Sequence, residues 1–350
     1  MAKSLQSFEA EQSELVKHLQ AQLDAKDRVL DDYKKNTGQL EVLSASVVAA
    51  VVASDPVPIL YNPKDEPSTT EVMGVHQNTD WHIGAQQNAD EIERINEYNY
   101  SIAHSRVEDL THRSNRLIER LRGSYKIRNG VLLCTGDMIS GDIHDELTRT
   151  NEFPVPIQVV KAAELFAAGV TVISQNYANL RVEYMTADNH SRLTRKPQAK
   201  EQGINSFNYL VAVIAEKILS RMNNIEFNIN TEPQKVVPVL NMRYLAMHGH
   251  QIKAWSGHAW YGWDRKVGKE STSRLAMIMD EPERMDTLGF NKIVAGHFHE
   301  PIDTLHFSIG GSLSGTDAYD RDNGRYAPPS QPIWLVSEKY GEFGRVNFTL

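Results

Sequence analysis

Five short motifs in this chain hold the residue types that proteins use to bind divalent metal ions. Carboxylate and amide oxygens combined with imidazole nitrogens suit Mn, Fe, Zn and similar ions, and two such ions can clamp a phosphate group. Each motif is common by itself, so it is their combination that indicates a two-metal site. In chain order the motifs are Asp80-Trp81-His82, Gly136-Asp137, Asn189-His190, His248-Gly249-His250 and Gly296-His297-Phe298-His299.

The last two motifs are the most informative, because they place four of the chain's 13 histidines in two short clusters. Packing rarely concentrates histidines in this way. The other motifs have common explanations besides metal binding. The Asp80–His82 triplet could lie on the exposed surface, and Asn189 could cap the N-terminus of a helix. Gly136 would let the backbone approach a ligand closely, and the carboxylate of Asp137 could bridge two metals.

The hydrophobic pattern predicts that each motif follows a strand. Predicted helices alternate with these strands, so the pattern indicates an α/β core. In such folds functional loops gather beyond the carboxyl ends of the strands, where all five motifs are expected. The predicted strands are residues 72–78, 130–135, 181–185, 243–247 and 292–295, and the predicted helices are residues 101–122, 157–178 and 207–222.

The end of the chain shows strand patterns alone. Residues 305–309, 333–336 and 344–348 are predicted as strands with no helix between them. Strands that alternate with helices and then follow one another directly predict a core that closes by packing one sheet on another.

The N-terminal part of the chain differs from the rest. Residues 7–35 lack proline and glycine and carry one apolar stripe, which predicts a helix that docks on its own domain or on a partner subunit. Recruitment or nucleic-acid binding is the alternative role for this helix. Residues 54–70 contain four prolines and are predicted to be a linker. The predicted organisation is a helical extension over residues 1–53, the linker over 54–70 and a catalytic domain over 71–350.

Composition limits the class of protein. A net charge of −8 excludes a generally basic surface for nucleic acid, so contact with a polyanion would need a local patch or bound metals. The single cysteine, Cys134, lies in an apolar run and is expected to be a buried thiol. The N-terminus lacks a signal-peptide pattern, and the apolar stretch of residues 42–53 is too short to span a bilayer. A cytoplasmic protein without membrane association is expected.

Taken together, the motifs resemble the signature of the calcineurin-like metallophosphoesterase superfamily: DxH, GD, GNH, HGH and GHxH, in that order. The resemblance covers roughly residues 72–311. It implies a four-layer fold of two packed mixed β-sheets flanked by helices. The run Thr79-Asp80-Trp81-His82-Ile83-Gly84 resembles the opening of the SbcD-type DNA repair exonucleases, and other segments resemble a phage and prophage branch of the superfamily.

The resemblance also implies a role for each motif residue. It implies two divalent ions, Mn in first place with Fe, Zn, Ni, Co or Mg as alternatives, and it makes His190 the catalytic histidine. Asp137 would bridge the two ions, which would share the attacking water. Arg192 could clamp a phosphate, with a solvated loop arginine as the alternative. His250 would contact the substrate or orient His248. The implied ligands are Asp80, His82, Asp137 and His299 for the first ion, and Asp137, Asn189, His248 and His297 for the second.

The sequence departs from the family pattern in one loop. Asp188 replaces the glycine of GNH, and Ser191 replaces the acidic residue that often follows the histidine. Asp188 is expected either to crowd the loop or to support a ligand. Residues 136–141 lack the form that is typical of Ser/Thr protein phosphatases, which counts against that activity.

A segment rich in tryptophan follows His250. Residues 253–269 hold three of the five tryptophans together with Lys253, Arg265, Lys266 and Lys269. Aromatic side chains interleaved with cations can stack bases and hold phosphates. A hydrophobic cap or a subunit contact is the alternative, and His258 within the segment is a candidate substrate contact.

These observations predict a dinuclear metal-dependent phosphoesterase that cleaves phosphodiester bonds with a metal-activated water. DNA is the expected substrate, cut as an exonuclease or an endonuclease. The alternatives are a phosphatase or phosphodiesterase for small nucleotides and, in a different class, a binding module without catalysis. A homo-oligomer or a protein partner is expected through the N-terminal helix.

Overall fold

The computed structural model describes residues 71–253 and 260–350. The chain divides into two units, Met1–Ser54 and Asp55–Leu350. Most of the predicted N-terminal helix, the proline-rich linker, Trp255 and His258 lie outside the described residues. Six further residues are described, all helical and exposed: Lys17, Gln20, Asp24, Lys26, Arg28 and Ala45.

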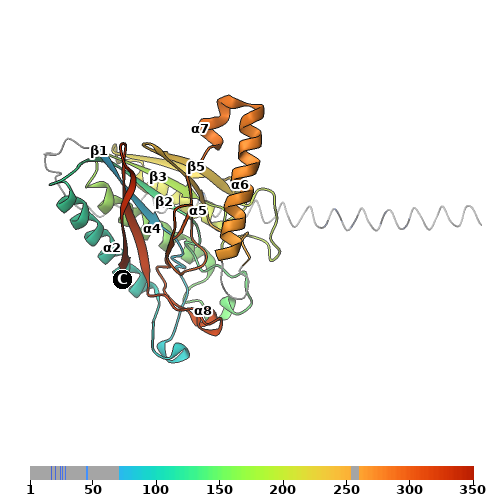
Figure 1. Cartoon of the computed structure of the whole chain (residues 1–350). Helices are drawn as coiled ribbons and strands as arrows, with labels where there is room; N and C mark the ends of the chain where they lie inside the picture. Colours follow the sequence, from blue (N-terminus) through green and yellow to red (C-terminus); the bar gives the residue numbers. More distant parts are fainter. Residues whose placement is uncertain are drawn as a thin grey trace, which may run out of the picture. The chain divides into compact units, whose positions relative to one another are not determined.

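Two mixed β-sheets form the centre of the second unit (Figure 1). The six-stranded sheet has the order β11 (Gly341–Thr349), β10 (Ser330–Ser337), β1 (Glu71–Asn78), β2 (Lys126–Cys134), β3 (Asn179–Met185) and β4 (Ile225–Asn230). The five-stranded sheet has the order β5 (Gln234–Val239), β6 (Met242–Met247), β7 (Lys292–Ala295), β9 (Phe307–Ile309) and β8 (Ile302–Asp303).

Parallel pairing places the ends of the central strands at one edge of each sheet. Strands β1, β2, β3 and β4 are parallel neighbours, as are β6, β7 and β9 in the second sheet. The outer strands β11, β10, β5 and β8 are antiparallel to their neighbours. The parallel arrangement brings the loops that follow β1, β2 and β3 to the same side of the sheet.

The sheets pack face to face through one apolar core. Val75, Val131 and Leu133 of the first sheet are fully buried against residues of the second. Alternate residues of a strand point to opposite faces, so these positions share the inner face. The partners from the second sheet are Val237, Val239, Tyr244, Ala246 and Val294. The sheet-on-sheet packing expected from the sequence is confirmed.

Helices cover the outer faces. The first sheet carries α2 (Tyr100–Leu121), α4 (Val155–Ser174) and α5 (Phe207–Leu219), and the ring of Phe166 in α4 lies 5.1 Å from that of Tyr184 in β3. The second sheet carries α6 (Trp260–Asp280), whose Trp263 stacks on Phe307 at 5.7 Å. Figure 1 shows α2 to the left of the strands and α6 to the right. The order is helix, sheet, sheet, helix.

Helix α4 is, in the part of the chain that the structure describes, the one helix long and apolar enough to cross a membrane. Of its most apolar window, 67% is buried within the fold. Its apolar residues are therefore accounted for by packing against α2, α5 and the first sheet.

Most predicted elements are present with small shifts at their ends, but one expectation is wrong and several strands and helices have no counterpart in the prediction. The late strands are interrupted by a short helix, α8 (Ala318–Asp322), between β9 and β10. Strands β4 and β5 lie at the edges of different sheets and are not predicted: β4 is only six residues long, and β5 contains Pro238. The tryptophan-rich segment continues as the long helix α6. The remaining short elements are η1 (Ala89–Ile92), α3 (Leu147–Thr150), η2 (Pro282–Arg284) and α7 (Met285–Leu288).

A buried histidine, His76, joins β1 to a tyrosine beneath the sheet. The Nε2 atom of His76 lies 2.8 Å from the hydroxyl of Tyr177. A notch made by two paired glycines holds the tyrosine ring: a Cβ at Gly130 would lie 2.7 Å from it. Burial lowers the pKa of His76 from 6.5 to about 3, so this imidazole is neutral at ordinary pH.

We expect His76 to weaken the fold in acid. Between pH 6.5 and about 3 the unfolded chain binds a proton at His76 that the folded protein excludes, so the free energy of unfolding falls as the pH falls. The loss at this site is at most about 1.4 kcal/mol per pH unit. Urea unfolding at pH 7 and pH 5 checks this: His76→Gln should lose less stability than the wild type. The exposed His112→Gln is the matched control, and equal losses in all three proteins would contradict the expectation.

Candidate metal centre

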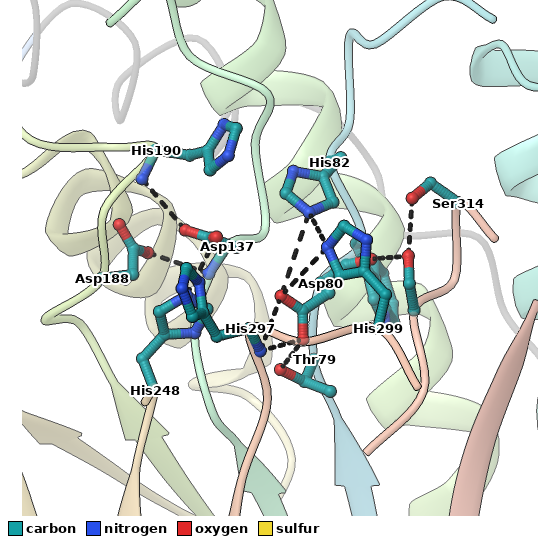
Figure 2. Close-up of polar contacts among 12 residues, drawn as sticks. Thr79, Asp80, His82, Asp137, Asp188, His190, His248, His297, His299 and Ser314 are labelled. Carbon is teal, nitrogen blue, oxygen red and sulfur yellow. Dashed lines mark hydrogen bonds and ion pairs between the residues drawn. The ribbon is translucent and has the colours of Figure 1, made fainter. Parts of the chain in front are cut away.

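All five motifs lie beyond the carboxyl ends of parallel strands. Asp80 and His82 follow β1, Asp137 follows β2, Asn189 and His190 follow β3, His248 follows β6, and His297 and His299 follow β7. The loops of the two sheets meet there (Figure 2).

Backbone hydrogen bonds join these loops in pairs. Asp80 N donates to Gly136 O at 3.1 Å, and Gly296 N donates to His248 O at 2.9 Å. The carboxylate of Asp80 then joins the two sheets, because it accepts from His297 N at 2.9 Å. A Cβ at Gly296 would overlap Thr79 and Asp80, so this close approach requires glycine.

The backbone at the site is strained. Five candidate ligands adopt positive φ angles, a conformation that costs about 1–3 kcal/mol for a residue other than glycine. Only nine described non-glycine residues have positive φ, so the strain is concentrated in this one place. The five are Asp80 (52°), His82 (48°), Asp137 (50°), His297 (76°) and His299 (61°).

One group of side chains forms around Asp80. The Nε2 atoms of His82 and His299 face each other at 3.1 Å (Figure 2). Asp80 Oδ1 lies 3.9 Å from the first nitrogen and 3.7 Å from the second. The other oxygen of Asp80 is already engaged, since it accepts from Thr79 Oγ1 at 2.6 Å. Oδ1 accepts a hydrogen bond from His297 N at 3.1 Å and is the oxygen that faces the two imidazoles.

A second group forms around Asp137. His248 Nε2 lies 2.9 Å from Asp137 Oδ2 and 2.9 Å from Asn189 Oδ1. His297 completes this group, with ligand atoms of Asp137, His248 and His297 all within 4.8 Å of one another. The ligand atoms of His82, Asp137 and His190 are equally close, so Asp137 lies between the two groups.

Three imidazoles are held so that Nε2 faces the site. The Nδ1 atom of His248 donates to the carbonyl oxygen of Thr135 at 2.8 Å. His190 Nδ1 donates to Ser140 O at 2.7 Å, and His299 Nδ1 lies 2.7 Å from Asp320 Oδ2. Hydrogen bonds of this kind fix the tautomer and orient the lone pair of a metal-binding histidine.

Burial and the charges of neighbouring side chains shift the pKa values of the candidate ligands. Burial would raise the pKa of Asp137, but His248 and His190 hold it well below its usual range. Burial lowers the pKa of His248, yet Asp137 outweighs this and raises it to about 9. Burial lowers the pKa of His299 as well, and Asp320 raises it to about 10. The carboxylates therefore stabilise positive charge in the space between the side chains.

These residues fit divalent cations. Asp80 and Asp137 are 0% and 1% exposed, and within residues 71–253 and 260–350 no lysine or arginine forms an ion pair with either. Buried carboxylates need a cationic partner. Burial keeps the pKa of His82 and His297 well below 6.5, so both imidazoles are neutral and can donate lone pairs.

His190 lies at the open side of the groups. Its ring centroid is 4.6 Å from that of His82. The ring centroid of His144, an exposed residue that the sequence did not single out, lies 6.1 Å from that of His190. With Nδ1 donating to Ser140 O, the Nε2 atom of His190 is the nitrogen free to exchange a proton.

Asp188 supports the loop that departs from the family pattern. It is 4% exposed, and its carboxylate accepts from Asp137 N at 2.9 Å and from Asn208 Nδ2 at 2.8 Å. Its second oxygen accepts from Ser191 N at 3.0 Å. Gly136 makes room for it, because a Cβ there would lie 2.9 Å from that of Asp188. Two roles are expected for Asp188, crowding the loop or supporting a ligand. These contacts agree with the second, because the carboxylate holds the backbone N–H of Asp137.

Arg192 is engaged by its own loop. Its guanidinium donates to the backbone carbonyls of Asn189 at 2.9 Å, Thr194 at 3.0 Å and Arg195 at 3.1 Å. The structure thus gives Arg192 a role in holding residues 189–195, while the charges of Asp137 and Asp188 act on its guanidinium.

The aromatic residues of α6 divide between core and surface. Trp263 is fully buried, whereas Trp260 and Tyr261 are 48% and 63% exposed. Lys266 forms an ion pair with Glu270 at 2.8 Å.

His250, whose ring lies 5.7 Å from that of His248, has a buried Nδ1 without a partner among the described residues.

Two supporting residues have no local signal in the sequence. Thr79 precedes a ligand and resembles any strand-end threonine. Asp320 follows His299 by 21 positions and lies on α8, a helix too short for its periodicity to be read. Only the folded chain brings Asp320 to His299.

No known family model and no curated protein matches the chain. Among solved structures, it is similar to the crystal structure of a conserved uncharacterized protein, a predicted phosphoesterase, from Streptococcus pneumoniae TIGR4. The TM-score is 0.29 and the identity 11%, over 81% of this chain and 100% of the other. A likeness of this size carries no argument about function, which depends on the geometry above.

We expect Asp188→Gly, which introduces the glycine of the GNH pattern, to destabilise the protein. The backbone N–H groups of Asp137 and Ser191 and the amide of Asn208 would lose their acceptor. Each buried donor left without a partner costs about 1–3 kcal/mol. Urea unfolding measures the change, with the exposed Asp142→Gly as the control for the added glycine. An unfolding free energy equal to that of the control would show that Asp188 does not support the loop.

Proposed function

We propose that this protein is a dinuclear metal-dependent phosphoesterase of the calcineurin-like superfamily. One observation carries the proposal: seven side chains from five strand ends converge in two groups, with Asp137 between them. The convergence joins two sheets and requires strained backbone at five of the seven residues. Strain concentrated at one place is typical of a functional site.

Each group supplies the donors that one ion needs. Asp80, His82 and His299 would hold the first ion, and Asn189, His248 and His297 would hold the second, with Asp137 shared. Mn is the first candidate ion. Fe, Zn, Ni, Co and Mg are alternatives, because mixed oxygen and nitrogen donors accept several divalent metals. Two such ions, when bound, neutralise a phosphate group and lower the pKa of a water molecule.

His190 is the proposed proton donor. Because Nδ1 donates to the Ser140 carbonyl, the protonated ring presents Nε2–H to the substrate side. A protonated imidazole can pass a proton to the leaving oxygen of the ester. The hydrogen bond from His190 N to Asp137 Oδ1, at 3.1 Å, fixes the histidine relative to the shared carboxylate.

We propose a phosphodiester in DNA as the substrate, cleaved by exonuclease or endonuclease action. The SbcD-like run at Thr79–Gly84 supports this choice. Exposed aromatic side chains close to the site support it too: Tyr319, 68% exposed, is adjacent to Asp320, which contacts His299. An exposed aromatic ring can stack a base.

A small nucleotide is the second candidate substrate. The net charge of −8 favours it, because an acidic protein repels long polyanions except at a local patch. The two candidates share the same phosphodiester chemistry at the metals and differ in what the surrounding surface must hold.

Hydrolysis of bis-p-nitrophenyl phosphate in the presence of Mn tests the reaction. We expect activity that is abolished by EDTA and restored by Mn. His190→Gln should lower kcat by about 10²–10⁴-fold, the usual contribution of a general acid, while leaving the bound metal in place. His104→Gln, an exposed histidine of α2, is the control.

Metal-independent hydrolysis, or a His190→Gln enzyme as active as the control, would contradict the proposed reaction. The substrate is decided by comparing single-stranded DNA, double-stranded DNA and a cyclic nucleotide with the p-nitrophenyl monoester. Turnover of DNA well above the other substrates supports the nuclease, and a preference for the cyclic nucleotide supports the second candidate.

A further inference from the structure

We propose that Asp320 is a positioning residue that orients His299 and so sets the metal affinity of the group around Asp80. This inference rests on the proposed function and extends it. It makes the two metal sites unequal: the site at Asp80, His82 and His299 depends on a carboxylate of α8, and the site at His248 does not.

The contact between Asp320 and His299 is short and buried. Asp320 Oδ2 lies 2.7 Å from His299 Nδ1, and the aspartate is 3% exposed. Its other oxygen lies 3.6 Å from a guanidinium nitrogen of Arg325. The Nδ1–H of His299 therefore points to Asp320, and Nε2 points to His82 and Asp80.

The helix holds Asp320 in place without using its carboxylate. The N-cap of α8 is Asp317, which accepts from Asp320 N at 2.8 Å. Ala318 N donates to Gln87 Oε1 at 2.9 Å, and Arg321 pairs with Glu93 at 2.7 Å. Since other residues fix α8, the carboxylate of Asp320 is left for His299 and Arg325.

In the site around Asp137, the Nδ1 atom of His248 has a different hydrogen-bond partner from that of His299. His248 Nδ1 donates to the backbone carbonyl of Thr135, which is neutral. A carboxylate makes an imidazole a stronger donor to a metal than a carbonyl does, because it stabilises the positive charge that develops on the ring. Loss of such a partner typically lowers metal affinity by about 10–100-fold.

Titration calorimetry of the metal-free full chain with MnCl2 alone tests the inference. We expect the wild type to bind two Mn ions per chain. Asp320→Asn keeps the shape of the side chain and removes its charge, so one ion should bind about 10–100-fold more weakly while the other is unaffected. Asp320→Glu, which keeps the charge, should retain most of the affinity.

Asp322→Asn is the matched control, because it removes the same charge from the exposed surface of the same helix. Thermal unfolding of the metal-free proteins checks that each variant is folded. Should Asp320→Asn not fold, the pair Asp320→Glu and Asp320→Gln makes the same comparison of charge in a longer side chain.

The possible results separate this inference from the proposed function. A wild type that binds no Mn overturns both. A wild type that binds two ions, with Asp320→Asn equal to Asp322→Asn, overturns the positioning role alone. Equal weakening of both ions by Asp320→Asn also overturns it, since that result indicates a general structural effect. Selective weakening of one ion supports it.

Discussion

The burial of two carboxylates without a lysine or arginine partner among the described residues is the constraint on which the rest of this structure depends. Asp80 and Asp137 are almost fully buried where the two sheets meet, and histidines are their ion-pair partners. Removing such charges from water costs several kcal/mol per ion unless a cation compensates them. The surrounding features follow from this need: lone pairs of neutral imidazoles point inward, backbone N–H groups support the carboxylates, and the strand ends adopt strained positive φ angles.

The layers around the site explain how the chain maintains that arrangement. The sheets are locked together by the apolar core between them, and α4 and α6 close the outer faces. Glycines permit the close contacts, as at Gly296 against Thr79 and Asp80. Beyond the candidate ligands, Asp188 supports the loop of Asn189 and His190, while Asp320 supports His299. The protein therefore uses three kinds of acidic residue at one site: those facing the metal space, those holding a loop and one holding an imidazole.

The sequence predicts much of this arrangement and misses specific parts for physical reasons. The strands that lead to the motifs have strong apolar runs, so β1, β2, β3, β6 and β7 are predictable, and with them the gathering of the motifs at one edge. Strands β4 and β5 are missed because β4 is a six-residue edge strand and β5 is an edge strand that contains Pro238. The sequence makes Trp263 a candidate for base stacking, but helical periodicity places it on the buried side of α6, against Phe307. The contact of Asp320 with His299 depends on tertiary folding alone. The metal-binding and catalytic roles of the motif residues stay predictions.

Two ions that share Asp137 should be visible by anomalous diffraction at the Mn absorption edge, from crystals grown with MnCl2. We expect two anomalous peaks, one bounded by Asp80, His82 and His299, the other by Asn189, His248 and His297, with the carboxylate of Asp137 contacting both. A single peak, or peaks away from Asp137, would contradict this expectation.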